Sequence, residues 1–184
     1  PKLDEVVFEL GGGSLLTRYE NDEIHIGYIP ASLLDSVKDG SNALAKEYRP
    51  VPNMAVFYFT LNPQKAPFDD PKVRQAFALT IDRETLNSVL LYDAYRVADG
   101  FLPPEMPGYT ESVSSYDYDV DRAKQLLAES KYAGNLPRIV LSYSGTGAAP
   151  GDLLVAVQER WQETLGVTIE LQAIDSSAFL REQR

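Results

Sequence analysis

Apolar residues recur along this chain with two alternating spacings, one typical of strands and one typical of helices. Short apolar runs bounded by glycine, proline or polar clusters predict five strands, at Val6–Leu10, Ile24–Tyr28, Val51–Leu61, Arg138–Tyr143 and Val167–Ile174. Helical spacing predicts helices between them, at Leu15–Glu20, Ser32–Val37, Gly40–Glu47, Asp119–Ser130 and Asp152–Thr164, with a last helix beginning at Ser176 or Ser177. The stretch from Arg138 to Ile174 reads strand, helix, strand, which is the size of a parallel βαβ crossover. The pattern therefore predicts an α/β fold.

Two further helix starts are packed into the stretch after the longest predicted strand. Asp70 is a candidate N-cap, with Pro71 at the first helical position, where its missing N–H costs nothing. Asp82 is the candidate N-cap of the next helix. The first of these helices then presents a short apolar face, made of Val73, Ala76, Phe77 and Leu79.

Alternation along the strand Val51–Leu61 separates its side chains into two faces. Phe57, Phe59 and Leu61 are expected to face the core. Tyr58 and Thr60 point the other way, and they would line a cleft if a second lobe covers that face. Trp161 lies on one helical face with apolar neighbours at helical spacing, Leu153, Leu154 and Val157, which favours core packing over a ligand platform.

A second candidate site is the loop that leaves the strand Arg138–Tyr143 and enters the following helix. In open α/β sheets, ligands lie outside the carboxyl ends of strands, where helix N-terminal amides offer donors. Four small residues could bring backbone N–H groups to a ligand carbonyl or carboxylate: Ser144, Gly145, Thr146 and Gly147. The alternative is a plain surface loop.

Composition narrows the function more by exclusion than by assignment. The 184 residues carry a formal net charge of −10, which weighs against nucleic acid and anionic membrane as partners. There is no cysteine, so disulfides and thiolate chemistry are excluded and the redox compartment is not indicated. The sequence contains no apolar run long enough for a transmembrane helix and shows no signal peptide.

Catalytic, metal and phosphate motifs are weak throughout. Asp117, Asp119 and Asp121 have the spacing of an EF-hand start, but the loop lacks its glycine and its final glutamate, so we expect no metal. His25 is the single histidine and has no nucleophile motif near it. The glycines at positions 11–13 lack both dinucleotide and Walker spacing, so they indicate a turn. We expect no cofactor.

The stretch from Asn62 to Glu84 carries the clearest motif, N-x-x-x-x-P-F-x-D-x-x-V-R-x-A-F-x-x-x-I-D-R-E. In this wording, after an aromatic-rich strand, it resembles the signature of the family 5 extracellular solute-binding proteins, the peptide receptors of ABC importers. Four other blocks resemble the family in the same order: Leu3–Ile26, Phe101–Tyr109, Tyr118–Gly134 and Trp161–Val167. One departure is His25, where the family usually has an acidic residue.

The resemblance implies a two-lobed, class II-like periplasmic-binding-protein fold. Residues 1–50 would be the end of the first, core lobe, and residues 51–184 the first part of the second. Both ends look cut, so we expect a piece of a larger receptor. The interlobe cleft would hold a peptide or similar solute for delivery to ABC permease subunits.

The same resemblance implies a monomeric, periplasmic or extracellular protein that is not an enzyme, anchored or free. It also puts Tyr58, Thr60 and the 144–147 loop at the cleft. Whether the ligand is a peptide, nickel or a sugar stays open. An interaction or sensory module with the same fold, or an α/β hydrolase, remains an alternative.

Overall fold

The structure is a computed structural model that describes residues 2–11, 13–51, 53–104, 106–111, 116–145 and 149–182, without the side chains of residues 180 and 182. Two compact units make up the chain, residues 1–50 (unit 1) and residues 51–184 (unit 2). This division coincides with the boundary that the resemblance implies. The assignment of the units to lobes stays a prediction.

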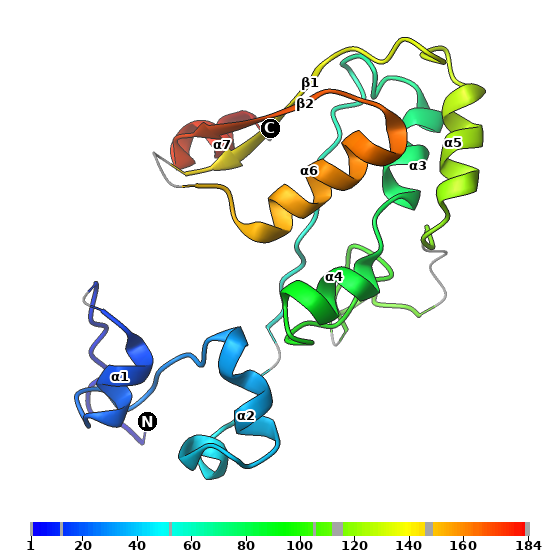
Figure 1. Cartoon of the computed structure of the whole chain (residues 1–184). Helices are drawn as coiled ribbons and strands as arrows, with labels where there is room; N and C mark the ends of the chain where they lie inside the picture. Colours follow the sequence, from blue (N-terminus) through cyan, green and yellow to red (C-terminus); the bar gives the residue numbers. More distant parts are fainter. Residues whose placement is uncertain are drawn as a thin grey trace. The chain divides into compact units, whose positions relative to one another are not determined.

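Unit 1 consists of short helices joined by irregular chain (Figure 1). The helices are α1 (Leu15–Glu20), the 3₁₀ turn η1 (Ala31–Leu33), α2 (Leu34–Lys38) and the 3₁₀ turn η2 (Ala43–Lys46). Ser14 caps α1 by accepting a hydrogen bond from the Thr17 amide at 3.3 Å.

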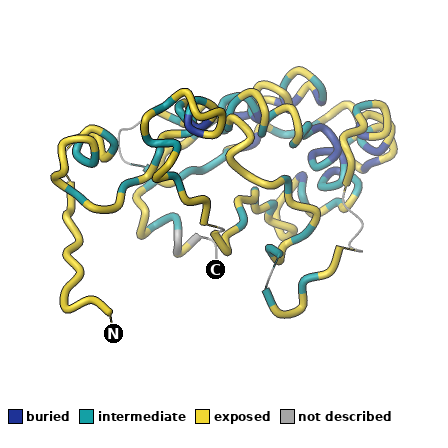
Figure 2. The backbone as a smooth tube through the Cα atoms, turned by 90° about the horizontal axis from the view of Figure 1, so that it is seen from below, coloured by how far each residue is buried: buried dark blue, intermediate teal, exposed yellow. Residues whose placement is uncertain are grey.

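The strands predicted at Val6–Leu10 and Ile24–Tyr28 are wrong. Neither segment pairs with another strand in the described residues. Without a buried face, the apolar alternation has no sheet to fit, and both segments are mostly exposed (Figure 2).

Unit 2 begins its regular structure with three capped helices, α3 (Pro71–Leu79), α4 (Arg83–Leu90) and α5 (Val120–Ala128). The predicted caps at Asp70 and Asp82 are confirmed, because their carboxylates accept the amides of Lys72 at 2.9 Å and Thr85 at 3.0 Å. α3 and α5 pack side by side (Figure 1).

The predicted βαβ unit is present at the end of the chain. Strand β1 (Ile139–Ser144) pairs in parallel with β2 (Ile169–Ile174), in a register that sets Ile139 beside Ile169. The crossover is α6 (Asp152–Leu165), which ends at Gly166 with a left-handed φ of 66°. α7 (Ser176–Glu182) follows β2.

Trp161 lies at the centre of the core of unit 2. Only 3% of it is exposed, and its indole N–H donates to the Phe77 carbonyl at 3.0 Å. The Trp161 ring meets Phe77 at 5.1 Å and Phe59 at 5.3 Å between centroids. The predicted core role of Trp161 is therefore confirmed, and the indole lies too deep to be a ligand platform.

The long strand predicted at Val51–Leu61 is also wrong. The described residues 53–61 form no ladder, and the one backbone hydrogen bond among them is local, from Ala55 to Asn53. A strand needs a partner as well as an alternating sequence. We call residues 53–61 the aromatic segment, because side chains rather than a ladder hold it.

Candidate functional site

The aromatic segment presents rings on two sides. The Phe59 ring packs inward on Trp161, and Leu61 also packs against the core, as predicted. Tyr58 is 57% exposed, and its ring meets the Phe101 ring edge-on at 5.2 Å. Thr60 is exposed. The predicted division of faces therefore holds for these four side chains.

Phe57 is an exception, because it was expected to face the core and is exposed. Its ring contacts Tyr95 edge-on, with centroids 5.8 Å apart and planes at 87°. With no ladder to fix the pleat, strict alternation is lost at this residue. We use the term aromatic surface for the four side chains of these two ring pairs, each at least half exposed: Phe57, Tyr58, Tyr95 and Phe101.

The second predicted site begins at the carboxyl end of β1. The Ser144 hydroxyl lies 2.8 Å from the Ser176 hydroxyl, and the Gly145 amide donates to the Ile174 carbonyl at 3.0 Å. Because Ile174 already accepts the Gly145 amide, that N–H is not available to a ligand in this conformation. Thr146 and Gly147 lie outside the described residues.

The structure does not join the two predicted groups. Among the described residues, no hydrogen bond or ring contact links Tyr58 or Thr60 to Ser144 or Gly145. Tyr58 and Thr60 belong to the aromatic segment, whereas Ser144 and Gly145 lie at the carboxyl end of β1, and both places are in unit 2.

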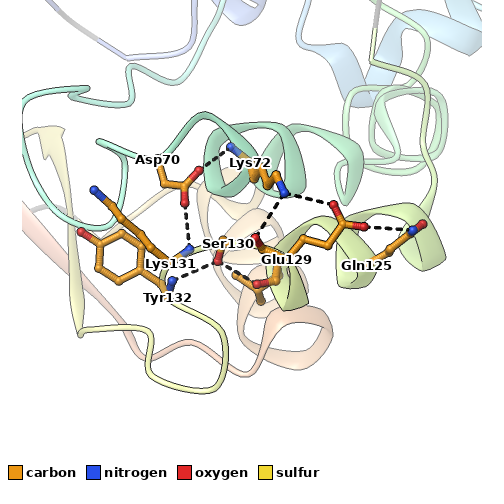
Figure 3. A network of polar contacts seen from close by, with 8 residues as sticks. Asp70, Lys72, Gln125, Glu129, Ser130, Lys131 and Tyr132 are labelled. Carbon is orange, nitrogen blue, oxygen red and sulfur yellow. Dashed lines mark hydrogen bonds and ion pairs between the residues drawn. The ribbon is translucent and has the colours of Figure 1, made fainter.

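A network of polar contacts links α3 with the end of α5 (Figure 3). The Asp70 carboxylate caps α3 by accepting the Lys72 amide, and it also accepts the Lys131 amide at 2.9 Å. The Lys72 ammonium donates to the Glu129 carboxylate at 3.1 Å and to the Glu129 carbonyl at 3.2 Å. Every polar group named in this network has a hydrogen-bond partner, which is typical of a structural link between elements.

Hydrogen bonds in this network lower the pKa of two carboxyl groups, those of Asp69 and Asp70. The Lys131 amide, and then the Lys72 amide, hold the pKa of Asp70 below its usual value. The Lys131 ammonium, with the Tyr132 hydroxyl, likewise lowers the pKa of Asp69. Both carboxyls are therefore held in the charged form by their hydrogen bonds.

Two small hollows lie among the described residues of unit 2. A hollow of about 200 Å³ lies between α4 and α6, and one of about 180 Å³ beside Arg74 and Tyr116. Both are smaller than the usual range of about 300–1,000 Å³ for ligand pockets. Neither is lined by a predicted site residue.

In the part of the chain that the structure describes, no three acidic or histidine side chains gather at a spacing that could hold a metal ion. Asp119, from the EF-hand-like run, instead caps α5 by accepting the Arg122 amide at 2.8 Å. No described helix is both long and apolar enough to cross a bilayer.

Sequence reasoning missed Tyr95 and Phe101, which complete both ring pairs of the aromatic surface. They lie in the loop after α4, where apolar residues recur with neither helical nor strand spacing. Their aromatic character in a loop was the available signal.

Comparison with known proteins gives one family model over the whole chain and several similar proteins. The family model "Bacterial extracellular solute-binding proteins, family 5 Middle" matches residues 1–184. The oligopeptide-binding protein OppA of Bacillus subtilis is 29% identical over 164 residues, which cover 84% of this chain and 29% of that protein. Di/tripeptide-binding protein 2 of Pseudomonas aeruginosa is 36% identical over 134 residues, covering 71% of this chain and 25% of that protein.

A solved structure, OppA of Burkholderia pseudomallei, superposes with a TM-score of 0.69 at 28% identity. The match covers 91% of this chain and 34% of that one. The chain thus spans about a third or less of the length of these similar proteins.

Proposed function

The chain belongs to family 5 of the bacterial extracellular solute-binding proteins, and on that premise we propose that it is part of the ligand-capturing receptor of an ABC-type importer. The receptor binds a peptide or similar small solute and passes it to permease subunits in the membrane. The observation that carries this proposal is the family match over all 184 residues, joined by relatives whose names state peptide binding.

The fold is the one that such a receptor needs. An α/β unit with a parallel βαβ crossover, similar in structure to a solved oligopeptide-binding protein, confirms the predicted fold class, part of a two-lobed binding-protein fold. Within it, we propose that residues 1–50 end the first lobe and residues 51–184 begin the second. The separate compactness of the two units supports this assignment.

We propose that the ligand lies in a cleft between the lobes of the full receptor. Tyr58 and Thr60 would form part of its wall, and the 144–147 loop another part. The exposure of Tyr58 and Thr60, and the position of Ser144 at the carboxyl end of β1, support this assignment. Apolar rings would supply contact area, and a few polar groups would fix orientation.

The mechanism in this proposal is capture without bond-making. Hinge closure of the lobes would bury the solute and exclude water, and the receptor would be periplasmic or extracellular and monomeric. His25 is exposed and has no hydrogen bond to a hydroxyl in the described residues, which supports binding over hydrolysis.

The test uses the full receptor that contains this chain, with isothermal titration of a pool of di- to pentapeptides. Thr60→Arg puts a long cation on the proposed wall and should weaken binding by at least about tenfold, roughly 1.4 kcal/mol, with the fold intact. Thr168→Arg is the matched control, because Thr168 is also exposed but precedes β2 at its amino end.

The outcomes separate two claims. If the unmodified receptor binds none of the peptides, the peptide assignment fails. If it binds them and Thr60→Arg either leaves affinity unchanged or unfolds the protein, the site assignment fails.

A further inference from the structure

The loop after α4 contains two consecutive residues in a left-handed backbone conformation, neither of them glycine. Tyr92 has a φ of 53° and Asp93 a φ of 49°. Residues with a Cβ enter this region at a steric cost, so the surrounding structure must hold them there. Such outliers gather where a protein needs a particular local geometry.

Asn87, in the last turn of α4, is the residue that holds this loop. Its backbone carbonyl accepts the amides of Leu91 and Asp93, both at 3.1 Å. Its side-chain amide nitrogen donates to the Tyr95 carbonyl at 2.8 Å and lies 3.5 Å from an Asp93 carboxylate oxygen. The hydrogen bonds of Asn87 therefore reach both the first residue of the loop, Leu91, and the last, Tyr95.

The side-chain oxygen of Asn87, unlike its side-chain nitrogen, forms no hydrogen bond among the described residues. This Oδ1 atom is buried. A buried acceptor without a partner costs stability. The stabilising contribution of the Asn87 side chain therefore comes from the hydrogen bonds that its nitrogen donates to the loop.

The residue at the end of the loop reaches the aromatic segment. Tyr95, whose carbonyl Asn87 binds, packs its ring edge-on against Phe57 at 5.8 Å. Phe57 immediately precedes Tyr58, the residue proposed to line the cleft. The aromatic segment has no ladder to fix it, so side-chain contacts hold it. Phe59 and Leu61 pack against the core, and the rings of Tyr95 and Phe101 contact Phe57 and Tyr58 from the loops.

We propose that Asn87 is a positioning residue for ligand binding: it holds the loop 91–95 so that Tyr95 buttresses Phe57 and thereby sets the orientation of Tyr58. This inference rests on the proposed function, because it takes Tyr58 as part of the ligand site. Asn87 itself touches no ligand in this scheme.

The test is made in the full receptor with two readouts, hydrogen exchange of the loop amides and affinity for the same peptide pool. Asn87→Ala removes the donor and should speed exchange at Leu91 and Asp93 by about tenfold, because local opening becomes easier. Affinity should fall on the order of fivefold, the size of a weak coupling between sites. Ser88→Ala is the control, because the Ser88 hydroxyl donates only to the Thr85 carbonyl within α4.

Two more variants keep the result decisive. Tyr95→Ala should reproduce the affinity loss, and Tyr95 is half exposed, so this variant remains informative even if Asn87→Ala does not fold. Adding Tyr92→Gly to Asn87→Ala should restore part of the affinity, because glycine adopts a positive φ without the steric cost. If this rescue fails, the conformation of the loop is not the cause of the affinity loss and the positioning role is overturned.

The failures are distinguishable. If the unmodified receptor binds no peptide, the proposed function fails. If it binds and Asn87→Ala speeds loop exchange without changing affinity, or if Tyr95→Ala leaves affinity unchanged, the positioning role is overturned while the proposed function stands.

Discussion

Asp70 does two jobs with one carboxylate. It accepts the Lys72 amide as the cap of α3 and the Lys131 amide from beyond α5. Both bonds favour the charged form, the Lys131 amide most, and they hold the pKa of Asp70 below its usual 3.8. The charge state of one residue thus bears on two elements far apart in sequence.

We expect stability to depend on pH through this residue. A carboxyl with a lowered folded pKa stabilises the fold fully above its usual pKa, and that contribution is lost as pH falls through the lowered value. The denaturant midpoint should therefore drop between about pH 5 and pH 2, and Asp70→Asn should flatten the drop, because asparagine caps a helix but does not titrate.

Asp70→Ala is the companion variant for this titration. It should lower stability at neutral pH as well, because the Lys72 and Lys131 amides both lose their acceptor. An unchanged pH slope in Asp70→Asn would show that other carboxyls govern the acid transition.

Helices were predictable from the sequence where a local signal marks their ends. The N-caps at Ser14, Asp70, Asp82 and Asp119 each accept a nearby amide, within a few residues of sequence. The strands predicted at Val51–Leu61 and in unit 1 do not form in the described residues, because a ladder depends on a partner that local alternation does not reveal. The candidate site followed the same rule: the outward side of Tyr58 was readable, but its partner Phe101 was not.

The end of α6 offers a test at the level of one element. Gly166 has a φ of 66° and open space around the position of a Cβ, so only the backbone conformation opposes a side chain there. Gly166→Ala should cost about 1 kcal/mol of unfolding free energy in denaturant titration. Gly166→Asn should cost less, because asparagine tolerates the left-handed region. Equal costs would mean that crowding, not conformation, decides.

At the scale of the whole chain, the core belongs to unit 2. Its buried apolar cluster joins α3, α5, α6 and both strands, whereas the described buried apolar residues of unit 1 are Leu34 and Val37. The family resemblance implies a lobe boundary at residue 50, and the division into two compact units falls at the same residue, whereas the packing inside each unit left no signal in the sequence.

The 184-residue chain alone should bind peptides weakly. The two hollows described above are below the usual size of ligand sites, and in the proposed function the rest of the cleft belongs to other parts of the receptor. Titration with the peptide pool should give no dissociation constant tighter than about 1 μM, roughly −8 kcal/mol. Nanomolar binding would contradict a cleft shared with other parts of the receptor.

The sheet of β1 and β2 has two strands and, among the described residues, no third. Each strand therefore keeps one side of its backbone without a ladder partner. Such edges template the pairing of further chains and are a recognised cause of aggregation. In a preparation of this chain by itself, such open edges would favour self-association through β1 and β2.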